Sequence, residues 1–300
     1  VAGMTYHLLR PWVNPLWAAV GPVLFVCSAP VTNSVYQLMT RHYLEGLLLS
    51  IFAFHCYLIA LKKDRFAWAC LGALCYFCAA GAKEVYVVLP LMLFLIPMGG
   101  WRKRVAYALP FFAVMGLYAL WRRYMLGTWV GGYGQTIDWT ALYHGVLGIP
   151  AVIFGDSPVG LLAFAIGVVV ILCAVWRNGA LRLWFVGGVV LILGPIAPAI
   201  NISDPQRLLL FFVWALSMAV VLSLGNMTFP ADRFKLVNAA LIAVIIFFIA
   251  SRGMALRPGL ESACHGYEVH GRFVMEHNEE QVLLPSAAYG NWFTAGLVWL

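Results

Sequence analysis

Nine apolar segments alternate with short polar connectors along the chain, and this pattern predicts helices that cross a membrane. The segments lie at about 11–29, 43–61, 66–82, 84–99, 105–121, 158–176, 183–200, 207–224 and 235–251. A helix needs about 20 predominantly apolar residues to cross the hydrocarbon core of a bilayer. Segments 66–82 and 84–99 are shorter, so we expect a broken helical hairpin whose outer tip is recessed into the membrane.

The predicted fold class is therefore all-α, a polytopic helical membrane protein with about nine transmembrane helices. Residues 1–251 form the transmembrane domain, and residues 252–300 form a small outer segment with an amphipathic helix and a short strand at 281–285. Of the 300 residues, 63% are hydrophobic and only 10% are charged, a composition that excludes a soluble domain.

Three connectors are predicted as loops on the outer side of the membrane. They span residues 30–42, 122–157 and 201–207. The longest, 122–157, is rich in glycine and aromatic residues, which predicts a mobile loop lying at the membrane interface, with 129–145 becoming ordered when a ligand binds. The opening residues 1–10 are interpreted as the tail of a preceding span.

The net charge of +7 is distributed unevenly between the two sides of the predicted membrane domain. One side carries eleven basic residues, Arg10, Lys62, Lys63, Arg65, Arg102, Lys103, Arg104, Arg177, Arg182, Arg233 and Lys235, against two acidic ones, Asp64 and Asp232. An excess of Lys and Arg marks cytoplasmic connectors. The basic excess is thus assigned to topology, without a nucleic-acid partner, and the C-terminus is expected to be extracytoplasmic.

The adjacent pair Lys83-Glu84 lies between two apolar segments, directly after the small residues 79–82. A charged side chain within the hydrocarbon region costs several kcal/mol unless it faces a cavity or a partner. The pair therefore predicts a hydrated pocket that holds a polar ligand. The alternative is a helix-terminal pair in which the two charges neutralise each other.

Further ionisable or polar residues are expected at the same outer depth. They are Arg41, His42, Tyr43, Glu45, Arg122, Arg123 and Arg207. Arginine and lysine at this depth suit a lipid-linked phosphate, and nearby carboxylates or histidine can hold a divalent ion or act as a general base. Each has a simpler interpretation: Arg122 and Arg123 as side chains reaching lipid headgroups, Arg207 as the partner of Asp204, and the others as interfacial anchors.

Three stretches together resemble the GT-C superfamily of membrane glycosyltransferases, in particular bacterial members similar to polyprenyl- or dolichyl-phosphate-dependent protein mannosyltransferases. They are residues 15–54, then GALCYFCAAGAKEVYVVLPLMLFLIP with its Lys83-Glu84 step and Pro90, and later SDPQRLLLFF with Arg207. The loop LGTWVGGYG is also similar to an outer loop of such enzymes. The resemblance covers most of residues 8–225.

The resemblance implies transfer of a sugar from a polyprenyl-phosphate donor on the outer face of a bacterial inner membrane. Lys83 and Arg207, with Arg122 and Arg123, would contact the donor phosphate, and Glu84 would orient Lys83 or bind near the sugar. Members differ in their use of a divalent ion such as Mg²⁺ or Mn²⁺. Their catalytic acid lies in the first outer loop, which is expected upstream of Val1, so no catalytic residue and no metal ligand is assigned here.

Two other functions stay open from the sequence. A transporter of a lipid-linked or small anionic substrate would show paired halves with matching broken helices, and 158–251 has no counterpart to the hairpin at 66–99. A non-catalytic membrane subunit of a larger complex, built on a degenerate scaffold of this kind, is the other alternative. The acceptor of a transferase would be a protein, a lipid or a glycan.

Overall fold

The computed structural model describes residues 1–36, 40–96, 98–127, 129, 139–154 and 206–225, with isolated helical positions between 158 and 276. The chain forms two compact units, Val1–Gly253 and Met254–Leu300. Every regular element in the described part is helical, which confirms the all-α class. The second unit shows helical positions between 254 and 276, whereas the strand expected at 281–285 lies outside the described residues.

The N-terminal part of the first unit contains three short helices, α1 (Ala2–Leu9), α2 (Pro15–Val26) and α3 (Ala29–Tyr36). Helix α2 begins after Asn14, whose side chain accepts a hydrogen bond of 3.0 Å from the Trp17 backbone N–H. A bend of 59° separates α2 from α3. The prediction of a loop from residue 30 was wrong, because the chain resumes a helix directly after the bend.

The predicted hairpin is present and consists of unequal limbs. Helix α4 (Arg41–Lys63) leads into α5 (Phe66–Ala82), which is followed by the 3-10 turn η2 (Glu84–Tyr86) and the short helix α6 (Leu89–Leu95). The Tyr76 hydroxyl donates a hydrogen bond of 2.8 Å to the Val87 carbonyl, so the returning chain lies beside the second half of α5. The segment predicted at 84–99 is thus a turn and a helix of seven residues.

The predicted outer loop at 122–157 is largely helical, which corrects the sequence interpretation. Helix α7 (Trp101–Leu126) continues past residue 122, and α8 (Trp139–Phe154) occupies the second half of the segment. Ile149 and Ile153, four residues apart in α8, are both buried, and this spacing explains the helix. Residues 139–145, expected to become ordered only with ligand, are already helical, while 130–138 lie outside the described residues.

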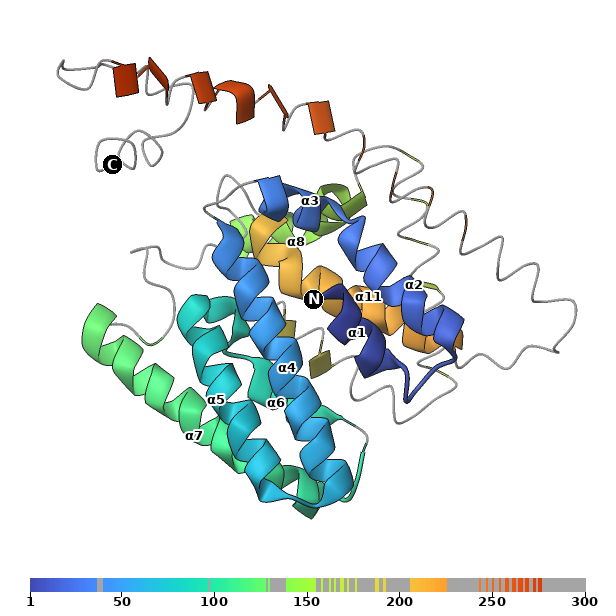
Figure 1. The fold of residues 1–300 in the computed structure, drawn as a ribbon, viewed down its shortest axis with the longest axis vertical. Helices are drawn as coiled ribbons and strands as arrows, with labels where there is room; N and C mark the ends of the chain where they lie inside the picture. Colours follow the sequence, from blue (N-terminus) through green and yellow to red (C-terminus); the bar gives the residue numbers. More distant parts are fainter. Residues whose placement is uncertain are drawn as a thin grey trace, which may run out of the picture. The chain divides into compact units, whose positions relative to one another are not determined.

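The last well-described elements are η4 (Gln206–Leu209) and α11 (Leu210–Gly225). Figure 1 shows α4, α5 and α7 side by side, and α11 packed along α2, in agreement with the contacts between these helices. Glycine permits the closest approaches: a Cβ added at Gly72 of α5 would lie 3.0 Å from the Ala53 carbonyl oxygen in α4 and 2.7 Å from the Phe111 ring in α7.

Two helices in the described part are long and apolar enough to cross a membrane, Arg41–Lys63 and Trp101–Leu126. The bent pair α2–α3 makes a third if it counts as one broken span. Large apolar side chains on α7 are exposed, among them Leu109 and Leu117, as expected for a helix that faces lipid. These helices are compatible with a membrane protein, and the count of nine spans stays a prediction.

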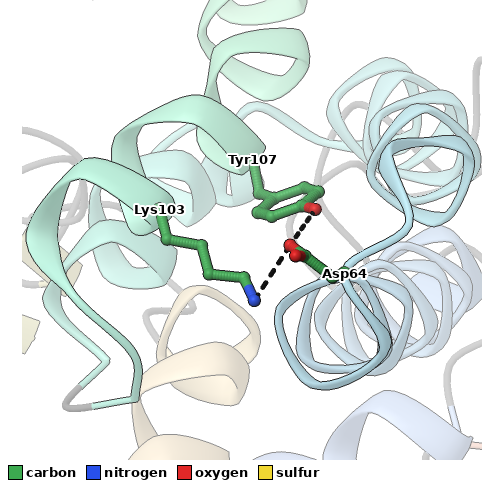
Figure 2. Close-up of polar contacts among 3 residues, drawn as sticks. All are labelled: Asp64, Lys103 and Tyr107. Carbon is green, nitrogen blue, oxygen red and sulfur yellow. Dashed lines mark hydrogen bonds and ion pairs between the residues drawn. The ribbon is translucent and has the colours of Figure 1, made fainter.

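At the end of the bundle opposite the hairpin tip, Asp64 joins the α4–α5 turn to α7. Figure 2 shows its carboxylate between two side chains of α7: the Tyr107 hydroxyl donates to Oδ1 at 2.6 Å, and the Lys103 ammonium lies 2.9 Å from the same atom. Asp64 adopts a left-handed backbone conformation, φ 57°, directly after α4. The sequence alone identifies Asp64 only as one of two acids on the basic side.

The bond from Tyr107, with the ammonium of Lys103, lowers the pKa of the Asp64 carboxyl below its ordinary value. The stabilisation is therefore present above the pKa of an unfolded aspartate, about 3.9, and is lost as the pH falls through the lowered folded value. We expect Asp64→Asn to melt earlier than the wild type at pH 7 and to lose less stability on acidification. Thermal melting in detergent between neutral and acidic pH measures both effects, and parallel pH profiles would contradict this account. Asparagine suits this test because it tolerates the left-handed backbone.

Candidate functional site

The tip of the hairpin places Lys83 and Glu84 where the chain leaves one helix and begins the next turn. The Lys83 N–H still donates to the Ala79 carbonyl at 3.1 Å and closes α5. The residue itself is extended, with φ −160° and ψ 137°, and η2 begins at Glu84. Both residues are half-buried. The backbone therefore changes direction at the pair and separates its two side chains from the regular helix surface.

Tyr43, in the first turn of α4, is the centre of the site. The Lys83 ammonium lies 5.3 Å from the centroid of the Tyr43 ring, a cation–π contact. The Tyr86 hydroxyl donates to the Tyr43 carbonyl and its ring packs on Phe211, four residues after Arg207, so the start of α11 lies beside the same tip. Tyr43 is only 2% exposed, so the Lys83 ammonium lies against a phenol largely removed from solvent. Residues far apart in the sequence, from α4, the hairpin tip and η4, thus meet at one place.

Arg122 brings α7 to the same tip. Its guanidinium Nη1 lies 3.7 Å from the Glu84 carboxylate, and the residue is only 8% exposed. This separation is longer than the roughly 2.7–2.9 Å of a tight charge-assisted hydrogen bond, so the contact is an ion pair without a direct hydrogen bond. The Glu84 carboxylate thus forms an ion pair with an arginine of helix α7.

Arg207 lies in η4, which packs against α3. The residue is half-buried, and its buried Nε has no hydrogen-bond partner among the described residues. Asp204, the simpler partner considered from the sequence, lies outside the described part of the chain. A buried guanidinium nitrogen with remaining donor capacity fits an anionic ligand, since arginine offers donors to phosphate or carboxylate oxygens.

Of the other residues expected in the site, Arg41, Glu45 and Arg123 are exposed, and His42 borders the cluster. Arg41 and Glu45 pair with each other at 2.7 Å, four residues apart on an exposed face of α4, which is the arrangement of an ordinary surface pair. Arg123 is exposed on α7. His42 packs against the neighbouring Tyr43 ring, with centroids 4.6 Å apart. The cluster at the tip therefore consists of Tyr43, Lys83, Glu84, Arg122 and Arg207.

Tyr86 is the residue at the tip that sequence reasoning missed. It is fully buried, its ring centroid lies 5.2 Å from that of Phe211, and its hydroxyl donates to the Tyr43 carbonyl. A tyrosine three residues after a charged break, inside an otherwise aliphatic run, was the available signal. Buried tyrosine needs a partner for its hydroxyl, and here the partner is the backbone of the site.

The assembled side chains can bind one anionic group with two cations and a phenol, beside a carboxylate–guanidinium pair. In the described part of the chain, no three His, Cys, Asp or Glu side chains come close enough together to hold a metal ion. No family model, curated protein or solved structure matches this chain. The chemistry of the cluster itself therefore has to carry any functional conclusion.

Proposed function

We propose that this chain is a GT-C-like glycosyltransferase that moves a sugar from a polyprenyl-phosphate donor to an acceptor at the outer face of a bacterial inner membrane. The observation that supports this most is the position of the Lys83 ammonium over the Tyr43 ring, at the tip of a short apolar hairpin beside which η4 carries Arg207. Two cations at such a place match a phosphate attached to a lipid, because the lipid stays in the hydrocarbon region while its phosphate reaches the tip.

The reaction would use this cluster to stabilise the leaving group. An acceptor oxygen forms a bond to the anomeric carbon, the bond from that carbon to the phosphate oxygen breaks, and the acceptor proton passes to a base. Negative charge grows on the departing lipid phosphate, and fixed cations lower the energy of that transition state. Lys83 and Arg207 would bind the phosphate, while Glu84, held by Arg122, would lie on the sugar side.

The remaining parts of the proposal follow from the same function. The proposal includes a C-terminal segment outside the membrane and an acceptor that is a protein, a lipid or a glycan. A divalent ion, Mg²⁺ or Mn²⁺, would need oxygen ligands, of which the described tip offers the Glu84 carboxylate. The general base is assigned to no residue of this chain.

Binding of a polyprenyl phosphate to the full chain in lipid nanodiscs tests the first half of the proposal. We expect the phosphate to bind at least about tenfold more tightly than the matching uncharged polyprenol, and Arg207→Gln to remove most of this preference, because a charge-assisted bond contributes roughly 1.5–3 kcal/mol. Titration followed by native mass spectrometry measures both ligands. Equal binding of the phosphate and the alcohol would contradict a phosphate site.

Transfer itself is tested with a radiolabelled polyprenyl-phosphate sugar in membranes that contain the chain. Release of free polyprenyl phosphate together with labelled acceptor is expected. Tight phosphate binding without transfer would instead favour the non-catalytic subunit of a larger complex.

A further inference from the structure

Tyr86 connects the separate parts of the tip through contacts of its side chain and its backbone. Its hydroxyl donates to the carbonyl of Tyr43, and its backbone N–H donates to the carbonyl of Lys83 at 3.3 Å. Its ring packs on Phe211, which follows Arg207 by four residues at the start of α11. Tyr86 therefore contacts the backbone of Tyr43, the backbone of Lys83 and the helix that follows Arg207.

Gly46 makes this arrangement possible on the α4 side. A Cβ added at Gly46 would lie 2.4 Å from Cε2 of the Tyr86 ring and 2.8 Å from Cδ2. Carbon atoms do not approach this closely, so the ring lies directly against the α4 backbone one turn after Tyr43. The Tyr86 ring is therefore held between Gly46 of α4 and Phe211 of α11.

From these contacts we propose that Tyr86 is the positioning residue of the site. It fixes the distance between the Tyr43 phenol, the Lys83 ammonium and the Arg207 guanidinium, and it does not itself contact the ligand. The expected effect on phosphate affinity rests on the proposed function. Its structural part, the placement of Lys83 against Tyr43, holds independently of any ligand.

Tyr86→Phe tests the hydroxyl, because it keeps the ring and removes only the bond to the Tyr43 carbonyl. We expect binding of a short-chain polyprenyl phosphate to weaken about tenfold, the size of effect that one buried hydrogen bond produces. Tyr57→Phe is the matched control: Tyr57 is also fully buried in α4, and its hydroxyl donates to the Arg104 carbonyl at 3.2 Å, near the opposite end of the bundle. The control is expected to keep the wild-type affinity while losing comparable stability.

Gly46→Ala tests position without changing the chemistry of Tyr86. The added methyl group displaces the ring, so affinity is expected to fall, and the double variant with Tyr86→Phe is expected to fall by less than the product of the two single effects. Independent effects that multiply would overturn the inference.

Acylation of the Lys83 amine, followed by mass spectrometry of the peptide, gives a readout that needs no donor. Faster labelling is expected in Tyr86→Phe than in the wild type and Tyr57→Phe, since the ammonium loses its fixed place over the Tyr43 ring. If the wild type binds no polyprenyl phosphate, the proposed function fails and the labelling rates still decide the positioning role. Equal labelling rates and equal affinities in Tyr86→Phe and wild type would overturn it.

Discussion

Lys83→Ala is expected to abolish sugar transfer and to leave the chain folded. The ammonium lies 5.3 Å from the centroid of the Tyr43 ring, and no other described lysine lies at the tip. Without it the leaving phosphate loses one of its two fixed positive charges, an effect on the scale of about a hundredfold or more in rate. Folding loses the cation–π interaction, of about 0.5–2 kcal/mol, and a side-chain hydrogen bond to Tyr43, so the melting temperature is expected to fall modestly while the chain stays folded.

Two companion variants make this result specific. Lys83→Arg keeps a cation on a side chain of different shape and is expected to recover part of the activity. Lys63→Ala removes an exposed lysine at the opposite end of α4 and is expected to transfer sugar at the wild-type rate. Transfer is measured with a labelled donor, and folding by size-exclusion profile and melting temperature. Normal turnover by Lys83→Ala would contradict the assignment of the site.

Gly72→Ala is expected to lower the melting temperature by forcing apart the helices α4, α5 and α7. The new Cβ would lie 3.0 Å from the Ala53 carbonyl oxygen, a backbone atom that cannot move aside as a side chain does. It would also lie 2.7 Å from the tip of the Phe111 ring. Overpacking of this kind costs typically about 1–3 kcal/mol, and here backbone has to shift.

Gly81→Ala supplies the matched control in the same helix. A Cβ at Gly81 meets no heavy atom within 4 Å, and alanine is the better helix former by about 1 kcal/mol. In thermal unfolding in detergent, Gly72→Ala should therefore melt at a lower temperature than the wild type, and Gly81→Ala at a higher one. Equal melting temperatures would show that α4 and α5 do not approach as closely as described.

The hairpin was predictable because its signal is local. Segment 66–82 matches α5 residue for residue, since small and apolar residues run without interruption from Phe66 to Ala82 and charges follow at once. The break at Lys83-Glu84 is confirmed as well, and beyond η2 the returning helix α6 packs mainly on α7. Apolar run length and the position of charges contain this information without reference to any distant part of the chain.

Other elements depended on information that a run of apolar residues does not carry. Helix α8 belongs to a segment whose glycine and aromatic content predicted a loop, and the helix is explained only by the buried pair Ile149 and Ile153. Helix α3 contains Thr, Asn and Ser, which do not form an apolar run, and it packs against η4. Tertiary packing, and not intrinsic propensity, decides both segments.

The candidate site shows the same division. Sequence reasoning selected Lys83, Glu84, Arg122 and Arg207 by their charge at a common depth, and the structure brings these together. It also selected Arg41 and Glu45, which satisfy each other on an exposed face. The depth of a residue in a membrane does not determine which face of its helix it occupies. Arg41 and Tyr43 lie in the same turn of α4 but on different faces of that helix.

The length of α5 has a consequence for how any ligand reaches this tip. Its 17 residues span about 26 Å along the helix axis, whereas the 26 residues of the neighbouring α7 span about 39 Å. The hydrocarbon core is about 30 Å thick, so a helix anchored at its basic end stops short of the opposite headgroup plane. In the membrane arrangement proposed above, the bilayer would thin around the tip, a hydrophobic mismatch that would let the phosphate of the proposed lipid donor meet the cations by lateral diffusion in its own leaflet.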